Sequence, residues 1–252
     1  MGVSGGPRVV KDTSLRYKID IKNKKSFRGG TTRLNNISPN KGGYVADTGN
    51  FPTDNGDYLS FDGTDDYILL DNLNYGNSNR IAEMSVFCWV RTTFNSGTAG
   101  TWNNNNWSIL DFDRSEVFTF TLNGTGEVQM SGRDGTNNYF DIVGTQRCND
   151  GEWHHIGWTY SSTDNEIIMY VDGEVDRTHT YASLGELGTG GSTRWGIIGD
   201  GSERTSSGSS ARNNIYFQGD IAKLTFYDNR VLTLNEVRRT YNAFKRRFRF
   251  ID

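Results

Sequence analysis

The sequence lacks the features that would place the chain in a membrane or in a disulfide-linked scaffold. No apolar run approaches the ~20 residues of a membrane span, and the opening MGVSGGPRVVKDTS contains no apolar core of a signal peptide. Cysteine is rare: only Cys88 and Cys148 are present, without CxxC spacing. We therefore expect two buried thiols, with a single disulfide as the alternative.

Proline is also scarce, with three residues, whereas glycine reaches 30 and aromatic residues make up 13%. This balance suits many short strands joined by tight turns. Large aromatic side chains compensate for an apolar content of only 34%, so we do not expect disorder. A chain of 252 residues fits one large all-β domain as well as two small ones. No internal repeat and no change of composition marks a second domain.

Residues 151–175, GEWHHIGWTYSSTDNEIIMYVDGEV, predict three consecutive strands. Ile156, Trp158 and Tyr160 share one face of the first strand, as the period of two requires. Asp172-Gly173 predicts a hairpin with a type I′ turn, which needs positive φ at both positions. Similar patterns predict strands at 15–21, 57–61, 66–70, 84–91, 108–112, 117–122, 127–131, 139–143, 195–198 and 215–227. Strands at this spacing favour an all-β, two-sheet antiparallel jelly-roll sandwich.

The hydrophobic period changes near the end of the chain. Thr233 and Glu236 form a capping-box pattern, and Val237, Tyr241 and Phe244 follow as one helical stripe. These residues predict a short helix that lies against the sandwich. The expected organisation is an N-terminal arm, a sandwich domain and, within that domain, the helix, at residues 1–14, 15–248 and about 234–247.

Charge is unevenly spread, although the net charge is only −3. Residues 1–50 carry a net charge of +7 and residues 236–252 a net charge of +4, whereas residues 51–235 carry −14. Basic ends that flank an acidic body suggest docking on an acidic partner, with ordinary solubilising charge as the alternative. The docking candidates are Arg8, Lys11, Lys245, Arg246 and Arg247. Because the ends lack a basic-aromatic platform, we expect no nucleic-acid partner, and no membrane partner either.

Three segments resemble the concanavalin A-like, laminin-G-type jelly-roll family of lectins and glucanases. They are SFDGTDDYILL (60–70), the segment 151–175, and GDIAKLTFYDNRVLTLNEVRRTYNAFKRRF (219–248). The last segment and the opening GGPRVVKDTSLRYKIDI are similar to single-domain structural proteins of tailed bacteriophages, although LRYKIDIKNKKSF has lysines where those proteins have small residues. The resemblance covers about residues 15–248.

This resemblance implies a non-catalytic virion structural protein, such as a decoration, fibre or tail-associated subunit. Its location would be the virion, and its partners other virion proteins or copies of itself. The alternative is an adhesin that binds cell-surface polysaccharide, and a more remote one is a glycoside hydrolase. The fold alone does not distinguish these functions, so they have to be argued from the side chains of the candidate sites.

The carboxylates give little support to hydrolysis. Glycosidases need two carboxyl groups that flank the scissile bond, and in this family they lie in an E-x-D-x-(x)-E signature. That signature is absent: residues 174–176 supply only its first half. Asp111 and Asp113, on one side of a strand, are the nearest geometric match. We therefore expect no enzymatic activity.

A glycan site would use aromatic faces for stacking and amides or carboxylates for hydroxyl groups. The segment WNNNNW (102–107) has both, with rim-packed tryptophans as the alternative. The Gly/Ser-rich run 199–214 is expected to form a mobile loop that could cover such a site. The candidate glycan-binding residues are Trp102, Asn104, Asn105, Trp107, Arg133, Asp134, Tyr139 and Arg194.

No cofactor is certain from the sequence, and calcium is a candidate. Relatives in the family hold a structural calcium at the sandwich edge, commonly through an aspartate in the final strand, but Ala222 stands at that position here. Asp62, Asp65 and Asp220, together with Asp66, could still assemble a site with backbone carbonyls. The alternative is that these aspartates only cap turns.

Overall fold

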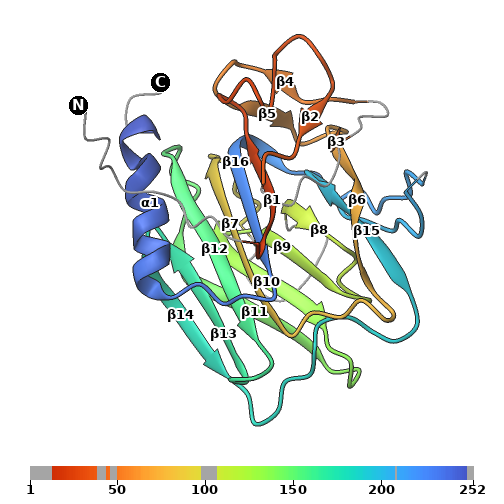
Figure 1. Cartoon of the computed structure of the whole chain (residues 1–252). Helices are drawn as coiled ribbons and strands as arrows, with labels where there is room; N and C mark the ends of the chain where they lie inside the picture. Colours follow the sequence, from red (N-terminus) through yellow and green to blue (C-terminus); the bar gives the residue numbers. More distant parts are fainter. Residues whose placement is uncertain (1–12, 39–43, 46–49, 98–106, 208, 249–252) are drawn as a thin grey trace.

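The computed structural model of this chain describes residues 13–38, 44–45, 50–97, 107–207 and 209–248. Figure 1 shows two sheets packed face to face, with helix α1 (Leu234–Phe248) against the outer face of one of them. The predicted all-β jelly-roll sandwich with a short C-terminal helix is therefore confirmed. In the described part of the chain, no helix is long and apolar enough to cross a membrane.

The larger sheet has the order β14-β13-β12-β7-β16-β5-β4, and β1 also pairs with β16. Its strands are β1 (Leu15–Asp20), β4 (Thr53–Asp54), β5 (Leu59–Asp62), β7 (Glu83–Arg91), β12 (His154–Ser161), β13 (Glu166–Val171), β14 (Glu174–Thr180) and β16 (Gln218–Asp228). All of its pairings are antiparallel, so neighbouring strands bring distant parts of the sequence together.

The smaller sheet has the order β11-β10-β9-β8-β15-β6. Its strands are β6 (Ile68–Gly76), β8 (Trp107–Asp111), β9 (Phe118–Leu122), β10 (Glu127–Arg133), β11 (Tyr139–Arg147) and β15 (Thr193–Ile198). A separate short pair, β2 (Leu34–Asn35) and β3 (Tyr44–Val45), belongs to the loops that Figure 1 places above the sandwich.

The three-strand segment that the sequence predicts lies in the larger sheet. Ile156, Trp158 and Tyr160 on β12 are fully buried between the sheets. The turn between β13 and β14 has φ of 51° at Asp172 and 87° at Gly173, as the type I′ hairpin requires. The segment is therefore scaffold, and any ligand must be held elsewhere.

Helix α1 covers the outer face of the larger sheet at β7. Trp89 on β7 faces α1, and its ring lies 4.2 Å from that of Phe248 and 5.6 Å from that of Tyr241. The helix begins at the predicted capping box, in which the Thr233 amide donates to the Glu236 carboxylate at 3.0 Å. The covered face explains why β7 carries large apolar residues on both sides.

The two cysteines are free thiols, and both are buried. Burial raises the pKa of both thiols well above the ordinary value, which keeps them protonated. Cys88 and Cys148 therefore act as small core residues, as expected from their spacing.

Candidate functional site

A pocket of about 320 Å³ opens at one end of the sandwich, where β7 ends and β16 begins. We call it the rim pocket. Its volume lies at the lower end of the range for small-molecule sites, about 300–1,000 Å³. It is lined by Phe61, Arg91, Thr92, Thr93, Phe94, Gly151, Gln218, Gly219 and Asp220.

The polar side of the rim pocket is held in place by an ion pair. Arg91 Nε donates to Asp220 Oδ2 at 2.8 Å, and Ser60 Oγ donates to Asp220 Oδ1 at 2.5 Å. Burial alone would lower the pKa of Arg91, but the hydrogen bond and charge of Asp220 raise it above the ordinary value. Thr93 and Gln218 are exposed at the mouth, where they can bind hydroxyl groups.

The aromatic side of the rim pocket is Phe94, which is half-buried. Its amide donates to Thr92 Oγ1 at 3.0 Å, and its carbonyl accepts from Asn149 Nδ2 at 2.9 Å, so its backbone is held at both ends. The Phe94 ring packs against the Trp107 indole, with 3.9 Å between ring centroids. Trp107 is half-buried and lines a narrow cleft beside the pocket, together with Phe217.

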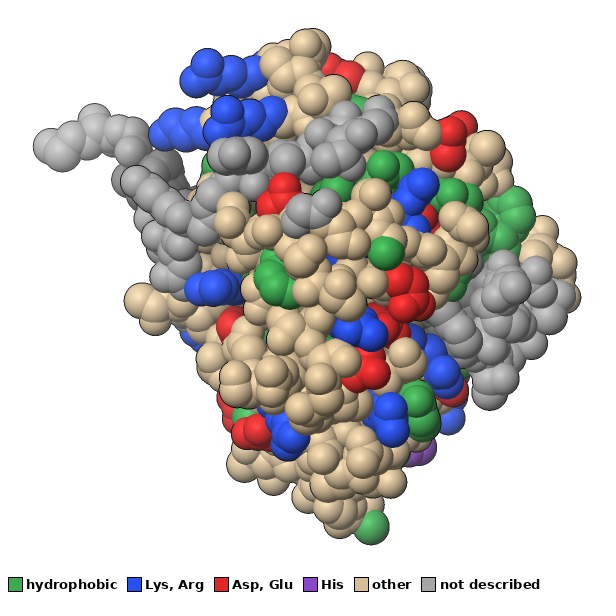
Figure 2. Space-filling view, turned by 90° about the vertical axis from the view of Figure 1, so that its right-hand side faces the viewer, with side chains coloured by type: hydrophobic (Ala, Val, Ile, Leu, Met, Phe, Trp, Pro, Cys, Tyr) green, Lys and Arg blue, Asp and Glu red, His purple; other side chains and the backbone are tan. Residues whose placement is uncertain are grey.

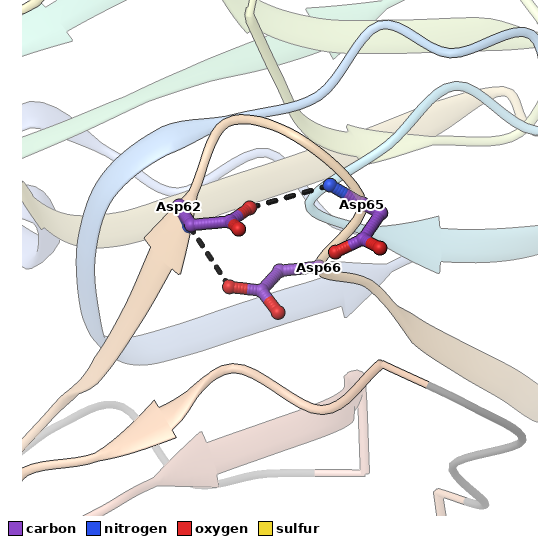
Figure 3. A group of neighbouring side chains, drawn as sticks. All are labelled: Asp62, Asp65 and Asp66. Carbon is purple, nitrogen blue, oxygen red and sulfur yellow. Dashed lines mark hydrogen bonds between the residues drawn. The ribbon is translucent and has the colours of Figure 1, made fainter.

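An acidic cluster lies next to the rim pocket, in the turn between β5 and β6. The carboxylates of Asp62, Asp65 and Asp66 lie within 4.8 Å of one another and are directed toward one another (Figure 3). Burial and the other two charges raise the pKa of Asp66, although its hydrogen bond from the Asp62 amide lowers it. Asp62 is the register partner of Gln218, which joins the cluster to the pocket.

The acidic cluster contains three of the four candidate calcium ligands, Asp62, Asp65 and Asp66. Asp220 does not join them, because Arg91 and Ser60 bond to its carboxylate oxygens. Three carboxylate oxygens and nearby backbone carbonyls are ligands that suit a divalent cation. The carboxylates also cap the turn, since Asp62 Oδ1 accepts from the Thr64 amide at 2.7 Å.

The predicted glycan residues do not form one site. Trp107 pairs with Leu122 at one end of the smaller sheet, whereas Arg133 pairs with Tyr139 at the other end. Trp102, Asn104 and Asn105 lie outside the described residues.

The distant end presents Tyr139, which is 51% exposed. The Arg133 guanidinium lies 4.6 Å from its ring centroid and that of Arg114 lies 5.4 Å away. Arg114 also makes a two-fold hydrogen bond to Asp141, at 3.0 and 2.7 Å. Arg194 is held nearby on β15 by Asp113, with 2.6 Å between Nε and Oδ2. These guanidiniums are thus engaged with the protein's own groups, and Tyr139 is the open surface.

Asp134, a predicted glycan residue, is buried inside a turn. It is 0% exposed, and its carboxylate accepts from the amides of Thr136, Asn138 and Gly185 at 2.9–3.0 Å. Although burial raises the pKa of Asp134, these hydrogen bonds lower it below the ordinary value overall. Asp134 shapes the turn that precedes β11.

The segment 199–214, which the sequence predicts as a mobile loop, is anchored in its described part by a buried arginine. Arg204 is 0% exposed and donates to the carbonyl groups of Ser207, Ser209, Leu70 and Gly196. A buried guanidinium with this many acceptors ties the loop to β6 and β15.

On the face that Figure 2 shows, acidic and basic side chains are interleaved across the middle.

The predicted docking residues near the C-terminus differ in their contacts. Arg247 donates hydrogen bonds within the protein, to the Asp20 carboxylate at 2.6 Å and to the Asp57 carbonyl at 3.0 Å. Lys245 lies over the Tyr241 ring at 5.4 Å, and Arg246 is exposed. Arg8 and Lys11 lie outside the described residues.

A family model described as the concanavalin A-like lectin/glucanases superfamily matches residues 62–238, well over half of the chain. The chain belongs to this superfamily. It is also 26% identical over 164 residues to "Sushi, von Willebrand factor type A, EGF and pentraxin domain-containing protein 1" of Mus musculus, and equally to that of Rattus norvegicus. The match covers 64% of this chain, which spans about 4% of the length of these curated relatives.

Solved structures share the superfamily fold. The binding domain of Paraclostridial Mosquitocidal Protein 1 has a TM-score of 0.64 and 13% identity, over 92% of this chain and 52% of that one. The botulinum neurotoxin serotype G binding domain has a TM-score of 0.59 and 15% identity, over 90% and 50%. A putative carbohydrate binding protein from Bacteroides ovatus has a TM-score of 0.50 and 12% identity, over 72% and 46%. At these identities the likeness concerns the fold alone.

The superfamily includes glucanases, and glycosidases hydrolyse with a pair of carboxyl groups. Asp111 is 1% exposed, and burial raises its pKa to about 7, although hydrogen bonds from Thr119 and the Ser202 amide lower it. Asp113 accepts from Arg194 and Ser115. Both are thus buried and bonded within the protein, and neither faces an open site.

The carboxylates at 174–176 are engaged as well. Glu174 binds Arg238 at 3.0 and 2.5 Å, and Asp176 accepts from the Thr145 amide at 2.8 Å. Among these four candidate carboxylates, no pair stands open on the two sides of a cleft, as a glycosidase of this superfamily would need.

Sequence reasoning missed Phe94 and Gln218. The Thr92 hydroxyl donates to the Gln218 carbonyl at 2.7 Å, across a separation of 126 positions. Neither Phe94 nor Gln218 belongs to a recognisable motif. Only the pairing of β7 with β16 brings the two residues to one pocket. A local sequence signal for this site does not exist.

Proposed function

We propose that this chain is a non-catalytic glycan-binding domain and that the rim pocket is its binding site. The observation that carries the proposal is the half-buried Phe94 ring beside the exposed Gln218 and Thr93 and the paired Arg91 and Asp220. A sugar ring offers an apolar face to an aromatic side chain and hydroxyl groups to donors and acceptors. Both kinds of group converge here.

The family supports this proposal. The superfamily contains lectins, and the Bacteroides ovatus structure is titled a putative carbohydrate binding protein. Other structures of this fold are titled binding domains of toxins. Together with the engaged carboxylates at 111, 113, 174 and 176, this favours binding without hydrolysis.

We expect Phe94→Ala to weaken glycan binding about tenfold, since loss of a stacking surface costs roughly 1.4 kcal/mol. Gln218→Ala should weaken it about fivefold through the loss of one or two hydrogen bonds. A glycan array first identifies a ligand for the wild-type protein, and titration calorimetry then measures its Kd for each variant.

Tyr139→Ala is the matched control, since Tyr139 is an exposed aromatic residue at the opposite end of the smaller sheet. Its Kd should equal that of the wild type. If Tyr139→Ala abolishes binding while Phe94→Ala does not, the rim pocket is the wrong site. A silent array with correctly folded protein contradicts the glycan-binding function itself.

We also propose that the chain is a structural subunit of a virion. It would dock on other virion proteins through basic residues at its two ends. Its support is the exposed Arg246 in the last turn of α1, beside Lys245. Arg8 and Lys11 are the corresponding candidates in the N-terminal arm. This setting is compatible with glycan binding, because the rim pocket and the end of α1 use different residues.

We expect Arg246→Glu, combined with Arg8→Glu and Lys11→Glu, to reduce incorporation into particles at least tenfold, because three reversed charges oppose an acidic docking surface. The readout is the number of copies per purified particle, measured by quantitative mass spectrometry. Arg177→Glu, on exposed β14, reverses a charge elsewhere and should have no effect. Normal incorporation of the triple variant would rule out docking through these residues.

A further inference from the structure

Helix α1 packs on the larger sheet through two separate groups of contacts (Figure 1). Its first turns belong to one apolar cluster, in which Val237 is 0% exposed. Its last turns belong to another, in which Phe248 packs on Trp89 and Trp153. The two ends of the helix are therefore held independently of each other.

The start of α1 is fixed by the segment that precedes it. Ser85 Oγ on β7 donates to the Arg230 carbonyl at 2.8 Å and accepts from the Leu232 amide at 2.9 Å. The capping box at Thr233 then follows at once. An opening of α1 would therefore begin at its last turns, which lie farthest from this anchored start.

The last turns cover a surface made of Trp89, Trp153, His155 and Lys223, which we call the covered face. Trp89 Nε1, Trp153 Nε1 and His155 Nδ1 are buried there without a hydrogen-bond partner among the described residues, and so is Thr240 Oγ1 on α1. Buried polar groups in folded proteins are nearly always bonded, and one that is not weakens the contact that buries it. Lifting the last turns would return these atoms to water.

His155 is the titratable ring of the covered face. It is 1% exposed, and its centroid lies 5.2 Å from that of Trp89 and 6.1 Å from that of Tyr241 on α1. Burial, and then the charge of Lys223, lowers the pKa of His155 to about 3. The docked helix thus keeps this imidazole neutral at a pH where an exposed one is protonated.

The basic groups around His155 disfavour a proton on its ring. Lys223, on β16, also contacts α1, since its amine lies 3.1 Å from the Phe244 ring centroid. From α1, Lys245 lies over the Tyr241 ring at 5.4 Å. The ring contacts of His155 with β7 are to uncharged aromatic rings. A protonated His155 would add a second buried cation beside Lys223.

The acidic group near His155 is Asp172, in the turn between β13 and β14. Its charge raises the pKa of His155, and its carboxylate accepts from the His155 amide at 2.9 Å. The other carboxylate oxygen bonds to the His154 ring at 2.9 Å. Burial lowers the pKa of His154, but its bonds to Asp172 and Asp150 raise it above the ordinary value overall. His154 therefore binds its proton without any opening of α1.

Two ion pairs oppose the opening. Arg238 binds Glu174 at 3.0 and 2.5 Å, and Arg247 binds Asp20 at 2.6 Å. The hydrogen bond from Arg238 lowers the pKa of Glu174 below its ordinary value, so mild acid does not break this pair. An opening in mild acid must therefore be driven from the covered face, where His155 lies.

We propose that the last turns of α1 are an acid-sensitive latch, which opens because only the opened state lets His155 bind a proton. The opened turns would lose helical structure, since isolated helices of fewer than ~12–15 residues are marginal in water. Opening exposes Trp89 and Trp153 and releases the basic end of the helix. The latch is independent of glycan binding in the rim pocket.

The sign of the effect follows from proton binding. Docking is complete above pH 6.5, the ordinary pKa of histidine, and is weakened below it, since the opened state then binds one proton more. The ratio of opened to docked protein rises about tenfold per pH unit, or about 100-fold between pH 7.5 and pH 4.5. Asp111, on the smaller sheet, stays buried during this opening and does not compensate. In global unfolding it does, because its folded pKa is about 7.

Hydrogen exchange measured by mass spectrometry, with protection factors corrected for intrinsic rates, tests the latch in the full chain. Between about pH 7.5 and pH 4.5, residues 241–248 should lose about 100-fold protection, whereas β10 should change less than about fivefold. Equal losses in α1 and β10 would indicate global unfolding and overturn the latch. Unchanged protection of residues 241–248 would overturn it as well.

Two variants assign the response to one histidine. His155→Phe keeps a stacked ring without a proton site, and its residues 241–248 should lose less than about threefold protection over the same range. His179→Gln is the matched control, because His179 is half-buried on β14 outside the covered face, and it should respond as the wild type does. A full response in His155→Phe would overturn the role of His155.

A measurement on the wild type keeps the proposal testable if His155→Phe does not fold. With ¹³C-labelled histidine, NMR follows the protonation of the His155 ring directly. The ring should take up its proton over the same pH interval in which residues 241–248 lose protection. Protonation of His155 while α1 stays fully protected would contradict the latch.

Discussion

Replacing Arg204 by methionine should lower the free energy of unfolding by about 3–5 kcal/mol, a large share of the ~5–15 kcal/mol typical of folded domains. Arg204 is 0% exposed and bonds to four backbone carbonyls and to the Asp71 carboxylate at 2.6 Å. Methionine has a similar length but no donor. The variant therefore leaves buried carbonyls and one carboxylate without a partner, and that desolvation cost is the source of the effect.

Urea denaturation of the variant and the wild type measures the change, through the midpoint at a constant m-value. Arg177→Met is the matched control: Arg177 is exposed on β14 and donates to a single carbonyl, that of Val143. The control should change stability by less than about 0.5 kcal/mol. If the Arg204 variant behaves like the control, the segment 199–214 is not anchored as the structure indicates.

A second large effect is expected from His155 as the pH falls. Its ring is 1% exposed and stacks on Phe87, with 5.2 Å between centroids and 11° between planes. Burial, and to a lesser degree the charge of Lys223, lowers the pKa of His155 to about 3. The folded protein thus keeps this imidazole neutral in mildly acidic solution.

The sign of the pH dependence of stability follows from the number of protons that the folded and unfolded states bind. In the unfolded chain the His155 pKa is near 6.5, so between pH 6.5 and about 3 the unfolded state binds more protons. The stabilisation by neutral His155 is complete above pH 6.5 and is lost as the pH falls, at roughly 1.4 kcal/mol per unit. From His155 alone we expect a loss of about 3 kcal/mol between pH 6.5 and pH 4.

Asp111 contributes in the opposite direction. Because burial raises its folded pKa to about 7, its contribution is complete below about pH 4 and is lost as the pH rises toward 7. Between about pH 4 and 6.5 the two slopes nearly cancel, so urea titrations of the wild type over this range should show little change from these two groups. His155→Phe keeps a stacked ring but removes the titration, so its stability should fall less in acid. An unchanged acid slope in His155→Phe would assign the slope to other groups.

The strands and the helix were predictable because their signals are local. The alternation of Ile156, Trp158 and Tyr160 reflects burial of one strand face, and positive φ at Asp172 and Gly173 follows from the turn itself. The capping box at Thr233 likewise involves neighbouring residues. These features depend on spacings of two to four positions, which one sequence displays directly.

The candidate sites were only partly predictable, because a site is made where distant loops meet. The prediction grouped Trp107 with Arg133 and Tyr139 by residue type, but strand register places them at opposite ends of the smaller sheet. Asp220 has the chemistry of a calcium ligand, yet its carboxylate accepts a hydrogen bond from Arg91 on a neighbouring strand. Composition identifies candidate ligands, and it cannot tell which side chains already satisfy one another.

By itself, the sequence determined the strands, the hairpin turn and the capped helix of this protein, since short-range periodicity and turn chemistry specify each of them. Tertiary structure alone decided where a ligand can bind. It brought Phe94 next to Gln218 and closed Asp134 into the interior. The physical reason is that antiparallel pairing and burial couple residues far apart in sequence, and only their joint geometry leaves a side chain free or engaged.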